Sequence, residues 1–193
     1  GNSKQEAKII HSSNSKQTTY PKRFLYLGRY TEHKGIFDLW QGYKQYKKQG
    51  GTWELICAGT GDQWVSRVKS DGISHLGFKQ PEEIPALIEQ IGAYILPSHF
   101  EPWGVSVHEM AAAGLPLLLS EEVGSNDAFL TEGKNGFSFP QKSPDQIAVA
   151  MLRIEKMSDM ELLRMGKVSH QKGSVINTRN WVQTVLEILN FRT

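Results

Sequence analysis

The fold of this chain is decided by one continuous run: Ala93-Tyr-Ile-Leu-Pro-Ser98, His99-Phe-Glu-Pro-Trp-Gly-Val-Ser-Val-His-Glu-Met-Ala-Ala-Ala-Gly114, then Leu115-Pro-Leu-Leu-Leu-Ser120. Tyr94 to Leu96 is a short apolar segment that ends at Pro97, which is typical of a buried strand. Helix-forming residues from Val105 to Ala113 predict a helix that Gly114 stops. A second apolar strand follows at once, so the run predicts a strand, a loop, a helix and another strand.

Two carboxylates bracket the start of this predicted helix, Glu101 in the loop and Glu109 inside the helix. The first amides of a helix have no intrahelical acceptor, so Gly104 and Val105 can offer N–H groups to an anion. Two acids would repel a simple phosphate. We therefore interpret the amides as a phosphate site and the acids as acceptors for neutral hydroxyls, with Glu109 holding a ribose diol and Glu101 a sugar ring.

Composition places the chain among ordinary globular proteins. Of its 193 residues 39% are hydrophobic and 22% are charged, enough for one domain with its own core. The 22 basic and 20 acidic side chains give a net charge of +2, too balanced to indicate a nucleic acid or an anionic membrane as partner. No apolar run is long enough to span a bilayer. The single cysteine, Cys57, agrees with a reducing compartment, and we expect a cytoplasmic protein.

Short apolar segments alternate with amphipathic ones along the rest of the chain. Further strands are expected at Phe24–Leu27, Trp53–Ala58, Ile73–Leu76 and Phe137–Phe139. Further helices are expected at Ile36–Lys48, Gln63–Lys69, Pro81–Ile91 and Asn126–Leu130, from Ser143 as the cap to about Lys156, from Ser158, and from Thr178. This alternation predicts a doubly wound parallel β-sheet with helices on both faces. Residues 1–22 are polar and unpatterned, and we expect a flexible lead-in or linker before a domain at 23–193.

The loops with unusual chemistry all follow predicted strands: residues 29–35, 59–62, 77–78 and 98–104. Because the carboxyl ends of parallel strands meet at one edge of a sheet, these loops should converge. Arg29 and Lys34 flank the first of them and suit a diphosphate, since Arg binds two oxygens and Lys supplies a point charge. In isolation they are as easily explained as two solvated surface charges.

Two motifs together resemble the family 4 glycosyltransferases of the GT-B type. Glu101 and Glu109 stand with seven residues between them, inside Glu-Pro-Trp-Gly-Val and Glu-Met-Ala-Ala-Ala-Gly-Leu-Pro, and Gly28-Arg29 is followed by Lys34-Gly35. The resemblance covers about residue 24 to the end. It implies a Rossmann-like, carboxyl-terminal donor-binding domain of a retaining glycosyltransferase in polysaccharide biosynthesis.

The resemblance also implies roles for individual residues. Arg29 and Lys34 correspond to the pair that binds the donor diphosphate, and Glu109 to the position that binds ribose. Glu101 corresponds to the position that orients the donor sugar and stabilises the transition state. Gly104 and Val105 supply amides to the distal phosphate, and Gly77 and Phe78 lie against the nucleobase.

The donor implied is a UDP- or GDP-linked sugar, and no metal or cofactor is expected. Two cations already serve the diphosphate, and no His/Cys cluster indicates zinc. Phe78 could equally be a core residue. His108 is better explained as a partly buried structural histidine than as an acid or base. The segment 124–127 departs from the family, which commonly has Gly-Gly and then Glu there.

The expected partners are the nucleotide-sugar donor and an amino-terminal acceptor domain that this chain lacks. We therefore expect the isolated chain to bind donor with little or no transferase activity, and any membrane association to depend on the missing domain. Two alternatives stay open from the sequence. One is a module that senses a nucleotide sugar without transferring it; the other is a sugar-nucleotide epimerase of the same architecture.

Overall fold

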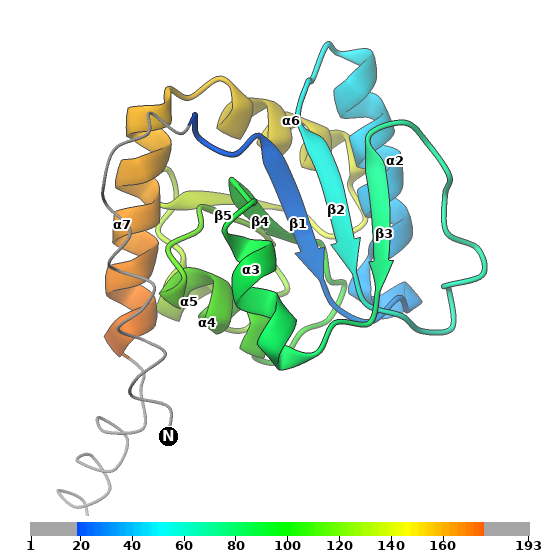
Figure 1. Ribbon diagram of the computed structural model, residues 1–193, viewed down its shortest axis with the longest axis horizontal. Coiled ribbons are helices and arrows are strands. Elements are labelled where there is room, and N and C mark those ends of the chain that lie inside the picture. Colours follow the sequence, from blue (N-terminus) through cyan, green and yellow to red (C-terminus); the bar gives the residue numbers. More distant parts are fainter. Residues whose placement is uncertain (1–18, 176–193) are drawn as a thin grey trace, which may run out of the picture.

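A computed structural model describes residues 19–175 as one α/β fold around a six-stranded, all-parallel sheet (Figure 1). The strand order is β3-β2-β1-β4-β5-β6. The strands are β1 (Arg23–Leu27), β2 (Glu54–Ala58), β3 (Ile73–Gly77), β4 (Ala93–Leu96), β5 (Leu117–Ser120) and β6 (Gly136–Phe139). The predicted doubly wound parallel sheet is confirmed.

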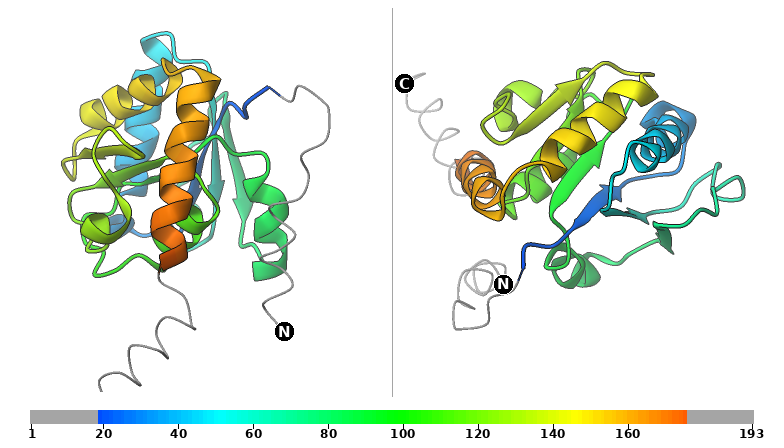
Figure 2. Two further views of the ribbon diagram at one scale, coloured as in Figure 1. Left: turned by 90° about the vertical axis from the view of Figure 1, so that its left-hand side faces the viewer. Right: turned by 90° about the horizontal axis from the view of Figure 1, so that it is seen from above.

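Helices cover both faces of the sheet. They are α2 (Ile36–Lys48), α3 (Ile84–Ile88), α4 (Val105–Ala112), α5 (Asn126–Phe129), α6 (Pro144–Glu155) and α7 (Asp159–Val175), with 3-10 turns η1 (Glu32–Lys34) and η2 (Pro81–Glu83). In the right-hand view of Figure 2, α2 and α6 lie together on one side of the sheet, and α3 and α7 lie on the other.

The middle strands are buried on both faces, which explains their continuous apolar sequences. Every residue of β4 and β5 is buried, and β1 is buried at its three central residues. The edge strand β3 instead alternates between half-buried and exposed residues. The apolar runs therefore mark the centre of the sheet. There, β2 and β3 are added on one side of β1, and β4 to β6 follow on the other side.

Helix α2 lies against α6 at a glycine. A Cβ on Gly42 would stand 2.6 Å from a methyl carbon of Ile147 and 2.7 Å from the carbonyl oxygen of Pro144. Both neighbours belong to the first turn of α6, and the Pro144 oxygen is backbone that cannot rotate away. The absence of a side chain at Gly42 thus sets the distance between the two helices.

Two of the predicted helices differ in the structure. Residues 63–69 form no helix; successive turns join Trp64 to Gly61 and Arg67 to Trp64, and the Gln63 amide bonds to the Tyr30 carbonyl instead. The segment has one partly buried aromatic residue, Trp64 against Tyr30, rather than an apolar stripe along a helix. Helix-forming residues without an apolar stripe to bury are not sufficient to form a helix here.

The helix predicted at Pro81–Ile91 divides into η2 and the short α3. Pro85 has no N–H to donate to the Pro81 carbonyl, so the Ile84 amide takes that place and makes a 3-10 turn. At the next helix pair, Ser143 precedes α6 but its hydroxyl bonds to the Gln141 carbonyl and not to the helix. Ser158 does form the predicted reciprocal cap with Glu161 before α7.

Most of the predicted lead-in, residues 1–18, and the helix predicted from Thr178 lie outside the described residues. Just before β1, the Tyr20 hydroxyl donates to the Gly92 carbonyl and Lys22 pairs with Asp159 of α7. Between residues 19 and 175, no helix is both long and apolar enough to cross a membrane.

Replacing Gly42 with alanine should lower the stability of the fold. In an open helix this change stabilises by about 1 kcal/mol. Here we expect a loss of about 1 to 3 kcal/mol, because the new Cβ overlaps α6. Urea unfolding should show this inverted sign, and Lys44→Ala, at an exposed site on the same helix, should change the unfolding free energy by less than about 0.5 kcal/mol. A stabilised Gly42→Ala variant would contradict the packing.

Candidate functional site

The candidate site lies where β1 and β4 are neighbours in the sheet. The chain leaves β1 toward β2 on one side and leaves β4 toward β5 on the other. In parallel sheets, such a switch in direction opens a crevice beyond the carboxyl ends of the two strands. The loops that follow β1 and β4, residues 28–35 and 97–104, both lie at this switch point.

The two loops are in direct backbone contact. The His99 amide donates to the His33 carbonyl at 2.8 Å. Gly35, at the start of α2, has φ of +68°, and a Cβ there would overlap the Pro97 carbonyl. A residue other than glycine would be strained in this conformation and would also push the loops apart. These contacts therefore fix the spacing of the two loops.

Charged side chains also join the two loops. Lys34 forms an ion pair with Glu101. The Lys34 side chain is only 17% exposed and the Glu101 side chain only 12%. His99 bonds through Nε2 to the Asp38 carboxylate in the first turn of α2. Lys34 and Glu101 were predicted to share one rim, and the structure places them in contact.

Two buried tyrosines support the rim from below. The Tyr94 hydroxyl, from β4, hydrogen bonds to Ser106 Oγ at 2.7 Å in the first turn of α4. The Tyr26 hydroxyl, from β1, donates to the Arg29 carbonyl at 2.6 Å. Burial raises the pKa of the Tyr94 hydroxyl, the bond to Ser106 opposes that shift, and the negative charges of Glu101 and Glu109 add to it.

The first turn of α4 opens onto this rim. Gly104 adopts a left-handed conformation, with φ of +85°, directly before the helix. Among residues 19–175, the amides of Val105 and Ser106 have no hydrogen-bond acceptor. These unpaired N–H groups give the helix start a positive end that can bind an anion.

Arg29 and Phe78 are both exposed at the same edge of the sheet. Within the described part of the chain, the Arg29 guanidinium has no side-chain partner. Gly77 accepts a hydrogen bond from the Gly59 amide at 2.7 Å, which ties the end of β3 to β2, and Phe78 follows with 65% of its surface exposed. Phe78 is thus a surface residue and not part of the core.

His108 has a structural environment. Its Nε2 bonds to the Gly173 carbonyl of α7 at 2.9 Å, and its ring stacks on Phe129 with centroids 4.9 Å apart. The interpretation of His108 as a structural residue is confirmed. In the departing segment, the Gly124 amide donates to the Glu101 carbonyl at 2.8 Å. Residues 124–127 therefore help to hold the loop that carries Glu101.

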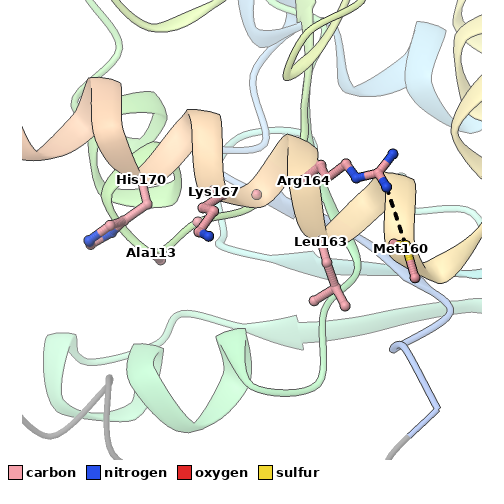
Figure 3. Close-up of a pocket in the computed structure, with 8 residues that line it drawn as sticks. Ala113, Met160, Leu163, Arg164, Lys167 and His170 are labelled. Atoms are coloured by element: carbon pink, nitrogen blue, oxygen red, sulfur yellow. Dashed lines mark hydrogen bonds between the residues drawn. The ribbon is translucent and has the colours of Figure 1, made fainter.

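No group of three or more potential metal-binding side chains occurs within residues 19–175. A shallow groove of about 490 Å³ does occur on the outer face of α7 (Figure 3), lined by Met160, Leu163, Arg164, Lys167 and His170 and by the end of α4 at Ala113 and Gly114. It lies at the opposite end of α4 from Gly104 and contains none of the residues predicted to bind.

Sequence reasoning found the charged residues of the rim but not the contacts among them. It missed Asp38 and His99, and the two tyrosines beneath the rim. Asp38 and His99 are 61 positions apart, and no local pattern joins them. Tyr26 and Tyr94 look like ordinary strand residues in the sequence. The one available signal is that a buried tyrosine hydroxyl needs a hydrogen-bond partner.

Comparison with known proteins places this chain in a family. The family model described as "Glycosyl transferases group 1" matches residues 7–171. Glycogen synthase of Mycobacterium tuberculosis is 30% identical over 140 residues, covering 69% of this chain and 34% of its own. The amylovoran biosynthesis glycosyltransferase AmsK of Erwinia amylovora is 28% identical over 149 residues, covering 70% of this chain and 36% of its own.

A solved structure shows the same fold. A mutant of TarM from S. aureus, in complex with Fondaparinux, alpha-GlcNAc-glycerol and UDP, superimposes with a TM-score of 0.77 at 17% identity. The match covers 92% of this chain and 36% of TarM. The chain thus spans about a third of the length of these relatives.

Replacing Glu109 with glutamine should raise thermal stability at neutral pH. The Glu109 residue is exposed, but the surrounding protein partly desolvates its carboxyl and raises its pKa, and the adjacent His108 opposes the shift. A carboxyl with a raised pKa in the folded state contributes stability only below its unfolded pKa and loses it as the pH rises through the folded value. The gain in Tm should therefore be present at pH 7 and vanish below about pH 4.

Glu122→Gln is the matched control, since it removes another exposed carboxylate near the same rim. Its Tm should change little with pH relative to wild type. Equal gains for the two variants at pH 7 would show that net charge, and not the environment of Glu109, is responsible.

Proposed function

The chain belongs to the glycosyl transferases group 1 family, and on that premise we propose that it is the donor-binding domain of a retaining glycosyltransferase. The donor in this proposal is a nucleotide-diphosphate sugar. The observation that supports it is the Lys34–Glu101 contact, which joins the loop after β1 to the loop before α4 at the switch point of the sheet.

Each part of the donor has a complementary group on this rim. Arg29 and Lys34 supply positive charge for the diphosphate, and the amides of Gly104 and Val105 receive the distal phosphate. Glu109 accepts hydrogen bonds from the ribose diol. Glu101 accepts them from hydroxyls of the sugar ring and so orients the bond that breaks. The base lies over Gly77 against the exposed Phe78 ring.

Transfer requires that negative charge build up on the leaving diphosphate. The amides and cations of the two loops stabilise that charge as it develops, and the backbones that carry them need not move because the two loops are already fastened together. Glu101 acts in this scheme as a positioning group beside the reacting carbon, not as the nucleophile. The charge on the diphosphate is met by protein groups, so the scheme needs no metal.

The acceptor is bound by a second domain outside this chain. The relatives named above are about three times as long as their matched segments, which leaves room for such a domain. Its closure over the rim would exclude water from the reacting sugar. In this proposal the chain alone binds the donor but transfers little, and the parent enzyme builds a polysaccharide. The buried free thiol of Cys57 fits a reducing, cytoplasmic compartment.

The role of Glu109 is tested with a nucleotide that lacks part of the diol. Wild type should bind UDP or GDP more tightly than the matching 2′-deoxy nucleotide by about tenfold, since a charged acceptor loses its donor. Glu109→Gln should bind the natural nucleotide about tenfold more weakly and should no longer distinguish the two. Isothermal titration calorimetry measures all four affinities. Equal discrimination by both proteins would place the ribose elsewhere.

The role of Arg29 is tested through salt dependence. Arg29→Gln should weaken binding of the nucleoside diphosphate by about tenfold in low salt. The loss should shrink as salt is added, because the interaction is between exposed charges. Arg153→Gln, which removes an exposed arginine from the outer part of α6, is the control and should leave affinity unchanged. If the two variants behave alike, Arg29 does not contact the diphosphate.

A further inference from the structure

We propose that Glu101 holds Lys34 in an ion pair until a nucleotide sugar binds, when the diphosphate takes Lys34 and the sugar hydroxyls take its place on Glu101. Glu101 thereby selects the nucleotide sugar over the bare nucleoside diphosphate. This inference rests on the proposed donor site and adds to it a source of selectivity. It follows from the contact between two residues that sequence analysis had assigned to different parts of the donor.

The pair is enclosed and self-contained. Lys34 and Glu101 are 17% and 12% exposed, and within residues 19–175 neither side chain has another ion-pair or hydrogen-bond partner. If a charged group that is shielded from water loses its partner, the free-energy cost of its desolvation is no longer offset. Any ligand that draws Lys34 away must therefore satisfy Glu101 as well.

The backbones that carry the pair are fastened independently of it. The Glu101 amide donates to the Glu122 carbonyl at 3.2 Å, and its carbonyl accepts from the Gly124 amide at 2.8 Å. On the other wall, the His33 carbonyl accepts from His99, and Gly35 lies against Pro97. The pair can therefore open by rotation of two side chains while the loops stay in place.

Both members of the ion pair gain a new hydrogen-bond partner only when the nucleotide carries a sugar. A diphosphate offers oxygens to the Lys34 ammonium but no hydrogen-bond donor to Glu101. A sugar on the distal phosphate brings hydroxyls that donate to the carboxylate in place of Lys34. The bare diphosphate thus leaves one enclosed carboxylate unsatisfied. Arg29 differs, because its exposed guanidinium gives up no protein partner within residues 19–175 when it binds phosphate.

The same exchange would act after transfer. Once the sugar has left, Glu101 again lacks a donor and recaptures Lys34. The nucleoside diphosphate then loses one of its cations, which weakens its hold on the rim. The pair would therefore favour release of the product as well as selection of the substrate.

The experiment compares affinities for UDP, GDP, UDP-glucose and GDP-mannose by calorimetry. In the nucleotide series that wild type binds, Glu101→Gln should tighten binding of the bare diphosphate by about tenfold, because Lys34 is released from a charged partner. Affinity for the sugar-linked form should stay equal or fall, so the preference for it drops by at least that factor. Glu101→Asp, which keeps the charge on a shorter side chain, should give a smaller change in the same direction.

Two controls isolate the pair. Glu122→Gln removes one negative charge beside the same loop without freeing a lysine, and should leave the preference unchanged. In a Lys34→Gln background, Glu101→Gln should no longer tighten binding of the diphosphate, because the coupled partner is gone.

The outcomes separate this inference from the function beneath it. If wild type binds a nucleoside diphosphate but Glu101→Gln binds it no more tightly than Glu122→Gln does, the exchange is wrong and the donor site stands. The same holds if the tightening survives in the Lys34→Gln background. If wild type binds none of the four nucleotides, the donor site itself is wrong and the exchange is overturned with it.

Discussion

The contact between the loops that follow β1 and β4 is the constraint on which the rest of the site depends. Gly35 meets the Pro97 carbonyl so closely that no side chain fits between them, and the His99 amide bonds across to His33. These contacts bring the Gly28–Gly35 loop and the loop that leads into α4 together at the switch point between β1 and β4. Without them, the cations and acids would be separate surface charges of little consequence.

The rim combines features that do not favour stability by themselves. Lys34 and Glu101 are largely withdrawn from water, desolvation raises the pKa of the Glu109 carboxyl, and the first amides of α4 lack acceptors within residues 19–175. In the proposed function, each of these groups binds a part of a nucleotide-diphosphate sugar. The sheet beneath, with Tyr26 and Tyr94 bonded into the rim, supplies the rigidity that holds them in place.

The accuracy of the sequence predictions follows the strength of the local signal. The helix from Ile36 to Lys48 was predicted with its observed bounds, since its apolar face repeats at helical spacing and glycines flank it. Residues 63–69 were wrongly predicted as a helix. Only Trp64 of this segment packs against the Tyr30 ring, and the Gln63 amide donates to the Tyr30 carbonyl instead of to a helical neighbour. Phe78 could not be assigned between core and surface, since an aromatic residue at a strand end suits both.

The sequence by itself determined the alternation of most strands and helices and the parallel sheet, and it nominated the candidate site residues, because periodicity, glycines and the motif around Glu101 and Glu109 are local patterns. Only the tertiary structure decided which of those residues touch. Lys34 and Glu101 stand 67 positions apart, and they form a pair because β1 and β4 are neighbours in the sheet. Contacts of this kind depend on how the elements pack, which no local run of residues encodes.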